Sequence, residues 1–415
     1  MNICTYTRLL IIGILSGTLL EGNAQEPRYP EIDGLVMTGY QGWFNAEGDG
    51  AGLHWKHYEK EHRFEPGSCT IDLWPEVSEY EKTYPTDFRL SDGSTARVFS
   101  SYDRSTTFLH FRWMHDYGID GAFMQRFIAS IRSPKGKANC DHILKNALKA
   151  AQQYDRALCV MYDLSGMHAS EADLLIDDWR ELMQQERITS QKPNQYLHYK
   201  GRPLVAIWGV GFNDGREYGF DEVERIVDTL RGMGCAILLG VPAHWRTLSM
   251  DTVSDDRLMK VIAKSDIVMP WFVGRFNAQS YPRFQGIIGD DIAWCQEHDI
   301  GYMPVLFPGF SWYNLRNGVA APLNQIPRLH GSFFWQQVYG AISQGARTLY
   351  LAMFDEMDEG TAFFKCANDV PVGASPFLSY EGCESDRYLW LAGMAAKALR
   401  HEIPLSSDMP TRKTE

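Results

Sequence analysis

Apolar, strand-like runs recur along the chain, and amphipathic stretches separate them. The runs are short and carry few polar residues, which is typical of strands buried on both faces of a parallel sheet. They cover residues 35–44, 121–127, 158–164, 203–209, 236–242, 267–273, 301–308 and 348–354. Helical periodicity between them covers residues 141–154, 170–187, 221–233, 290–298 and 332–343.

This alternation of strand and helix predicts parallel pairing with right-handed crossovers. Eight such units predict an α/β fold, a closed (β/α)8 barrel. The alternative is a doubly wound sheet of six or seven strands, but no glycine fingerprint follows the first run. The Gly-rich residues 48–52 precede no helix and are expected to form a loop.

The first crossover, residues 45–120, is unusually long. Its residues 106–117 are predicted to form the first barrel helix. A structureless loop of the remaining length is uncommon, so the insertion is expected to carry its own structure and to cap the site. Asp72, Trp74 and Asp103 are the candidate capping residues, and a structural turn role remains the alternative for each.

Polar and aromatic side chains gather where the apolar runs end. The C-terminal ends of barrel strands hold the active site of such folds, so this coincidence across strands predicts a site there. Any single residue of this kind is more often a rim or capping residue than a ligand. The expected substrate-binding residues are Tyr40, Gln41, Trp43, Asp72, Trp74, Gln125, Arg126, Asp163, Trp208, His244, Trp271, Arg275 and Trp312.

The last apolar run leads into four acids within five residues, Asp355-Glu356-Met357-Asp358-Glu359. Two carboxylates spaced i, i+3 at a strand end can reach into one cleft. Cleavage of a glycosidic bond needs such a pair, because one carboxyl protonates the leaving oxygen while the other acts as base or nucleophile. A solvated acidic turn is the alternative reading of these residues.

Composition narrows the class of partner. The net charge of -12 and the pI near 5.5 argue against nucleic acid or an anionic membrane surface. The 12 Trp, 20 Tyr and 21 Phe suit an oligo- or polysaccharide substrate, since sugar sites often place aromatic faces against the apolar side of a ring. No cofactor is expected, and no His, Cys or Asp spacing indicates a metal site.

The first 24 residues have the pattern of a secretory signal peptide. Arg8 precedes an apolar stretch of about 12 residues, and the small residue Ala24 marks the expected cleavage site. No later stretch is long enough to cross a membrane. Residues 25–415 are therefore expected to form one secreted or periplasmic catalytic domain, and a monomer.

Removal of the leader leaves an odd number of cysteines. Cys159, Cys235 and Cys295 lie in apolar patterns and are expected to be buried thiols. Cys366 and Cys383 flank a loop rich in Pro, Gly and Ser, and they are the two candidates for a disulfide.

With these residues laid out, the chain resembles glycoside hydrolase families 99 and 71, the endo-α-mannosidase and α-1,3-glucanase-like barrels. The likeness rests on Gly39-Tyr40-Gln41-Gly42-Trp43-Phe44, on residues 304–310 with Trp312 and Asn314, and on residues 354–361. It implies that Glu356 assists attack by the sugar's own 2-hydroxyl and that Glu359 is the general acid/base, with net retention. It also implies an α-linked, mannan-like substrate.

The chain departs from the family pattern beside the first glutamate. Asp355 and Met357 stand where family 99 has Asn and Trp, which indicates a divergent branch and leaves the sugar open. Glu359 must be protonated at working pH, whereas Glu356 is expected to be held ionised by donors such as Arg275 or His244. Tyr40, Gln125, Trp208 and Trp271 are expected to hold hydroxyls and to stack on the ring.

Three functions remain open at this point. The first is a retaining α-glycosidase of carbohydrate metabolism. The second is a glycosidase of other specificity, for instance one that removes xylose or arabinose side chains. The third is a barrel that binds polysaccharide without cleaving it, since the fold alone does not fix the chemistry.

Overall fold

The computed structural model describes residues 26–316, 318–319 and 322–412. The predicted signal peptide lies outside these residues. Parallel strands form one curved sheet in the order β10-β9-β8-β7-β5-β4-β1-β12-β11. These strands are β1 (Val36–Tyr40), β4 (Gly121–Phe127), β5 (Ala157–Asp163), β7 (Arg202–Trp208), β8 (Ala236–Pro242), β9 (Ile267–Trp271), β10 (Gly301–Tyr302), β11 (Val305–Leu306) and β12 (Leu349–Leu351).

The two edges of the sheet meet because β10 and β11 are two consecutive halves of one barrel strand. β10 pairs with β9, and β11 pairs with β12. Between them, the Met303 amide donates to the Val268 carbonyl at 3.0 Å, and the Tyr350 amide donates to the Pro304 carbonyl at 3.0 Å. The sheet therefore closes into the predicted (β/α)8 barrel. The run 301–308 is split because Pro304 has no N–H to donate.

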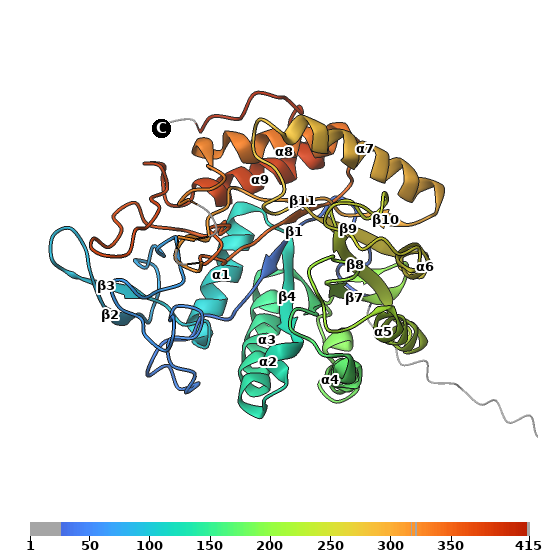
Figure 1. The fold of residues 1–415 in the computed structure, drawn as a ribbon, viewed down its shortest axis with the longest axis horizontal. Helices are drawn as coiled ribbons and strands as arrows, with labels where there is room; N and C mark the ends of the chain where they lie inside the picture. The colour runs from blue at the N-terminus through green and yellow to red at the C-terminus, as the bar shows by residue number, and fades with distance from the viewer. Residues whose placement is uncertain (1–25, 317, 320–321, 413–415) are drawn as a thin grey trace, which may run out of the picture.

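Helices cover the outside of the barrel (Figure 1). They are α1 (Arg104–Tyr117), α2 (Ile128–Ile131), α3 (Pro134–Tyr154), α4 (Ala172–Gln184), α5 (Phe220–Gly232), α6 (Arg257–Ile262), α7 (Tyr281–Glu297), α8 (Ser332–Ser343) and α9 (Arg387–Leu399). Short 3-10 turns are η1 (Ala169–Glu171), η2 (Ile188–Ser190) and η3 (Leu329–Gly331), and β6 (His198–Tyr199) pairs antiparallel with β7.

Sequence signals explain where α3 begins. Ser133 caps α3 by accepting from the Gly136 amide at 3.0 Å, and Pro134 occupies the first turn, where no N–H is required. α9 was not predicted, because no strand follows it in the β/α alternation. It packs closely on α1 at Gly393, where a Cβ would lie 2.1 Å from the Tyr117 carbonyl oxygen.

The insertion after β1 carries its own structure, as predicted. Its antiparallel pair, β2 (Tyr84–Arg89) and β3 (Thr95–Val98), lies beyond α1 at the edge of the molecule (Figure 1). Single β-bridges join the insertion to the chain after β12, at Leu73 with Leu378 and at Pro75 with Cys366. The insertion and the C-terminal segment therefore form one layer beside the acidic loop that follows β12.

Candidate active site

One pocket, of about 170 Å³, lies at the C-terminal ends of the barrel strands. Its lining comes from the ends of β1, β4, β5, β7 and β9 and from the loop after β12. Eight residues predicted from the sequence meet there: Gln41, Trp43, Gln125, Asp163, Trp208, Trp271, Glu356 and Glu359. Phe127, Ser165 and Met353 complete the lining.

Glu356 is almost fully buried, and both of its carboxyl oxygens accept hydrogen bonds. Gln41 Nε2 donates to Oε1 at 2.9 Å, and Thr361 Oγ1 donates to Oε2 at 2.9 Å. Burial raises the pKa of Glu356, and the charges of Glu359 and Asp358 raise it further, while the Thr361 bond opposes the rise. The predicted donors Arg275 and His244 are therefore wrong, because neutral groups hold this carboxyl.

Glu359 is half-buried at the mouth of the same pocket. Burial raises its pKa to about 7, and the charge of Asp358 adds to the rise. Arg316 and Arg275 oppose it. A carboxyl with this pKa holds a proton at neutral pH in a substantial fraction of molecules, as a general acid must.

The other two acids of this loop, Asp355 and Asp358, do not point into the pocket. Asp355 is fully buried and accepts from the amides of Gln41 at 2.7 Å and Gly42 at 2.8 Å, which fastens the end of β1 to the acidic loop. Asp358 lies 3.4 Å from His57 Nδ1. Burial raises the pKa of both Asp355 and Asp358 to about 7. Neither side chain lines the pocket.

The acidic loop is fixed from a second side by Arg328, which is itself buried. Its Nη2 donates to the carbonyls of Gly360 and Ala362, both at 2.8 Å, and its guanidinium lies over the rings of Tyr380 and Tyr388. These contacts hold the backbone directly after Glu359. A preorganised backbone keeps a catalytic carboxyl within the narrow geometry that proton transfer requires.

Aromatic side chains form two walls of the pocket. Trp208 and Trp271 meet edge to face, with ring centroids 5.3 Å apart. Trp43 stacks on His57 at 3.8 Å and leans on Phe127 at 5.3 Å. Such faces suit the apolar side of a pyranose ring, while Gln125 and Asp163 offer polar groups to its hydroxyls.

Asp163 is a third pocket carboxyl with a raised pKa. It is buried at the end of β5, and its Oδ1 accepts from the Ser165 amide at 2.7 Å. Burial raises its pKa to about 6, against the effect of that hydrogen bond and of Arg216. It lines the same pocket as the two glutamates and is the third acid of the lining, and its charge raises the pKa of Glu359.

Five predicted site residues lie elsewhere. Tyr40 is buried under α1, where its hydroxyl meets His110 Nδ1 at 2.9 Å. Trp74 is buried in the insertion and donates to the Arg97 carbonyl at 3.0 Å. His244 bonds to Asp251 at 3.1 Å and Arg275 to the same carboxylate at 2.8 Å, in a neighbouring hollow of the same face. Trp312 packs on Phe310.

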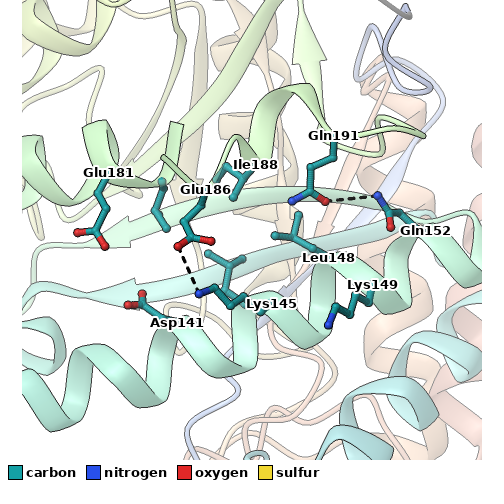
Figure 2. A pocket seen from close by; sticks show the side chains of 11 residues that line it. Asp141, Lys145, Leu148, Lys149, Gln152, Glu181, Glu186, Ile188 and Gln191 are labelled. Atoms are coloured by element: carbon teal, nitrogen blue, oxygen red, sulfur yellow. Dashed lines mark hydrogen bonds and ion pairs between the residues drawn. The ribbon is translucent and has the colours of Figure 1, made fainter. Parts of the chain in front are cut away.

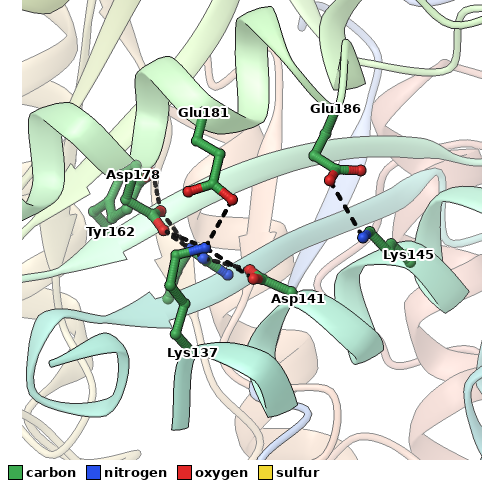
Figure 3. A network of polar contacts seen from close by, with 8 residues as sticks. Lys137, Asp141, Lys145, Tyr162, Asp178, Glu181 and Glu186 are labelled. Atoms are coloured by element: carbon green, nitrogen blue, oxygen red, sulfur yellow. Dashed lines mark hydrogen bonds and ion pairs between the residues drawn. The ribbon is translucent and has the colours of Figure 1, made fainter. Parts of the chain in front are cut away.

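Two other predicted site residues are structural. Asp72 is fully buried and binds the loop after β11. Arg126 faces away from the pocket, because successive side chains of a strand alternate and Gln125 faces into it. It donates to Asp178 at 2.5 Å and to Asp141 at 2.6 Å. These two acids belong to the ion network between α3 and α4 (Figure 3). Tyr162 also donates to Asp178, at 2.6 Å.

Replacement of Arg126 by methionine is expected to destabilise the fold by about 3 kcal/mol, because it leaves the Asp178 carboxylate buried without its bidentate partner. Lys137, 3.7 Å from Asp178, replaces only part of the lost interaction. Urea unfolding followed by tryptophan fluorescence measures the change. Lys145→Met, which breaks the half-exposed pair with Glu186, is the matched control and is expected to cost less than about 1 kcal/mol. Equal losses in the two variants would contradict this role for Arg126.

A roomier pocket, of about 300 Å³, lies between α3 and α4 on the outside of the barrel (Figure 2). Its acids are matched by lysines: Lys145 pairs with Glu186 at 3.3 Å, and Lys137 pairs with Glu181 at 3.2 Å. It lies away from the strand ends. The smaller pocket is therefore the candidate active site, because it gathers carboxyls with raised pKa values and no neutralising partner in contact.

The structure also describes Met357 and the cysteines that the sequence singled out. Met357, in the position of the family's tryptophan, is fully buried and does not line the pocket. All seven cysteines of the described residues are free thiols, so Cys366 and Cys383 form no disulfide. Cys366 is buried, where burial raises its pKa to about 12, while Cys383 lies in a turn. The described cysteines at 159, 235 and 295 are buried, as predicted.

The described residues contain no helix long and apolar enough to cross a membrane. Within the same residues, no group of three or more His, Cys, Asp or Glu side chains has the arrangement of a metal site.

Comparison with known proteins places the fold. No protein-family model matches the sequence, and no curated protein does. Two solved structures of the GH99 endo-α-mannosidase from Bacteroides thetaiotaomicron, one in complex with bis-tris-propane, are each 15% identical. Each match covers 89% of this chain and 98% of the other, with a TM-score of 0.64. At this identity the likeness establishes the fold: the chain is a (β/α)8 barrel of the kind seen in glycoside hydrolase family 99.

Proposed function

We propose that the protein is a retaining glycoside hydrolase that cleaves α-linked, mannan-like glycans with Glu356 and Glu359. The observation that carries the proposal is the meeting of these two carboxyls in one pocket at the C-terminal end of the barrel. Both have raised pKa values, and both stand among aromatic walls suited to a sugar. The likeness to an endo-α-mannosidase fold supports the substrate class.

The hydrogen bonds support a division of roles between the two glutamates. Gln41 and Thr361 both donate to Glu356, which favours its ionised form, whereas no side chain of the described residues donates to the Glu359 carboxyl. When two like charges share a site, the pair retains one proton over a wide pH range. The two donors to Glu356 favour a proton on Glu359, which serves as the acid, while Glu356 serves as the base. Burial acts in the other direction, because it raises the pKa of Glu356 well above its ordinary value and that of Glu359 to about 7.

The reaction follows from these roles. Glu359 gives its proton to the glycosidic oxygen as the bond from that oxygen to the anomeric carbon breaks. Glu356 takes the proton of the sugar's 2-hydroxyl, whose oxygen bonds to the anomeric carbon from the opposite face, or its carboxylate attacks that carbon directly. Glu359, now ionised, removes a proton from water as the water oxygen bonds to the anomeric carbon. The bond from that carbon to the 2-oxygen, or to the Glu356 carboxylate, breaks at the same time, and in the first case Glu356 returns its proton to the 2-oxygen. Two displacements give net retention.

A substrate screen tests the proposal. Aryl α- and β-glycosides of mannose, glucose, xylose and arabinose are compared with α-mannan and α-glucan, and release of aryl alcohol or reducing ends is measured. We expect cleavage of α-mannosides or α-mannan. Cleavage of xylosides or arabinosides alone would keep hydrolysis and reject the mannan-like substrate. Binding of glycans without any cleavage would reject hydrolysis.

The pH dependence gives a second test. The acid form of Glu359 is needed, so kcat/KM is expected to fall as pH rises through about 7, where this group loses its proton. An ordinary glutamate, with a pKa near 4.3, would have lost its proton by about pH 6. A profile of kcat/KM from pH 4 to pH 9 measures the pH at which the rate constant falls on the alkaline side. A decline complete by about pH 6 would contradict a raised pKa for the acid.

We also propose that the protein is secreted or periplasmic. Support comes only from the leader-like pattern of residues 1–24. Intact-mass measurement on protein recovered from outside the cytoplasm is expected to show a chain that begins at Gln25. Recovery of the full-length chain inside the cytoplasm would contradict it.

A further inference from the structure

Asp72 is a buried carboxylate that binds a distant loop. None of its surface is exposed, and burial raises its pKa. One carboxyl oxygen accepts from the Ser311 hydroxyl and from the Tyr313 amide at 2.7 Å, and the other accepts from the Asn314 amide at 2.8 Å. Three donors converge on one side chain, so Asp72 fixes the conformation of residues 311–314.

Other residues of the insertion hold the same loop. Lys60 Nζ donates to the carbonyls of Asn314 and, at 3.2 Å, of Leu315. The Asn314 side chain donates to the Ile71 carbonyl at 2.9 Å. The backbone of Asp72 also bonds to the acidic loop directly, because its amide donates to the Met357 carbonyl at 3.0 Å.

The loop fixed by Asp72 contacts the backbone of the catalytic acid. The Ser311 amide donates to the Glu359 carbonyl at 2.9 Å. Gly360 packs directly against Ser311, too closely for a side chain. Its φ is +63°, and a Cβ on it would lie 2.9 Å from the Ser311 nitrogen. Any displacement of Ser311 therefore moves the backbone directly after the Glu359 α-carbon.

The same loop carries one of the two positive charges near Glu359. The Arg316 amide donates to the Trp312 carbonyl at 2.9 Å, and its guanidinium lies 4.8 Å from the Trp312 ring centre. The charged groups that act on Glu359 are Glu356 and Asp358 of its own loop, Asp163 of β5, Arg275 after β9, and Arg316. Of these five, only Arg316 sits on the turn that Asp72 fixes.

We propose that Asp72 is a positioning residue for Glu359, which acts by holding residues 311–314 so that Ser311 fixes the Glu359 backbone and the charge of Arg316, two residues further on, stays close to the site. The insertion after β1 is then a brace for the acid loop. That the insertion positions Glu359 is argued from the contacts above. That this positioning affects turnover rests on the proposed function.

The test is a direct titration of Glu359 in the full mature chain. Glutamate labelled with ¹³C at the carboxyl carbon gives one signal per residue, and the signal missing from Glu359→Gln identifies Glu359. Asp72→Asn keeps one acceptor oxygen for three donors, so the turn loosens and Arg316 no longer opposes the raised pKa. We expect the pKa of Glu359 to rise by about half a pH unit or more.

Two further variants make the result interpretable. Ser311→Ala removes the side-chain contact with Asp72 without placing a new polar group, and the same upward shift is expected. If Asp72→Asn does not fold, Ser311→Ala decides the outcome. Asp103→Asn is the matched control: Asp103 lies in the same insertion but binds Lys82 and Tyr84, so no shift is expected.

The experiment distinguishes failure of the brace, that is, of the positioning of Glu359 by Asp72 and the insertion, from failure of the proposed function. If the pKa of Glu359 moves in Asp72→Asn and Ser311→Ala, the basic limb of kcat/KM should move upward with it. Movement of the titration in a protein that cleaves no glycoside would support the brace and reject the function. An unchanged titration in folded Ser311→Ala and Asp72→Asn would overturn the brace, whatever the activity.

Discussion

Glu359→Gln is expected to lower kcat/KM by about 10²–10⁴-fold on substrates with poor leaving groups, the range typical of general acid catalysis. The amide cannot give a proton to the glycosidic oxygen. Aryl glycosides with strongly acidic leaving groups need little protonation, so their cleavage should suffer much less in the first displacement. Initial rates across a series of aryl leaving groups measure the difference.

The fold should tolerate this change. Glu359 has a raised pKa in the folded state, so its ionised form opposes folding above the pKa of the unfolded chain, and a neutral side chain removes that cost. Glu224→Gln on α5, where the carboxylate pairs with Arg257 and Lys264 outside the barrel, is the control and should retain full activity. An equal loss on good and poor leaving groups would reject Glu359 as the acid.

Glu356→Gln is expected to lose activity on every substrate, by about 10²–10⁴-fold or more. The base, or nucleophile, is required whatever group leaves. In addition, the amide nitrogen would face one of the two donors, Gln41 or Thr361, so the side chain would also lose a hydrogen bond. Rates on the same leaving-group series measure the loss.

An attempt to trap a covalent intermediate shows whether Glu356 acts as a base toward the 2-hydroxyl or as the nucleophile itself. If the 2-hydroxyl is the nucleophile, a 2-deoxy-2-fluoro donor leaves no adduct on the wild-type protein, as intact mass would show. A covalent glycosyl group on Glu356 would reject that form and leave direct double displacement. Preserved activity of Glu356→Gln toward activated aryl glycosides would reject both.

The barrel could be predicted from the sequence because strands buried on both faces leave unbroken apolar runs. The bounds of β4 and β8 coincide with the predicted runs 121–127 and 236–242. The prediction was less accurate where burial and pairing diverge. The regular strand β12 covers only Leu349–Leu351 of the run 348–354. Beyond it, the amides of Ala352 and Phe354 still donate to the Leu306 and Gly39 carbonyls, and Phe354 is fully buried, so the run reflects burial beyond the regular strand.

The site could be predicted in part. Gln41 and Gln125 were found with their neighbours Tyr40 and Arg126, which the alternation of strand side chains places on the opposite face. The same alternation, applied outward from Gln125, would have found Phe127. The role of Asp72 could not be predicted, because it depends on a contact with Ser311, far along the chain, that no local pattern records.

The most direct test of the account is the configuration of the first product. ¹H NMR spectra taken within minutes of adding the protein to an α-linked substrate distinguish the two anomers before mutarotation mixes them. We expect the α-anomer to appear first, and we expect Glu356→Gln to produce neither anomer at a comparable rate. First appearance of the β-anomer would contradict retention by Glu356 and Glu359.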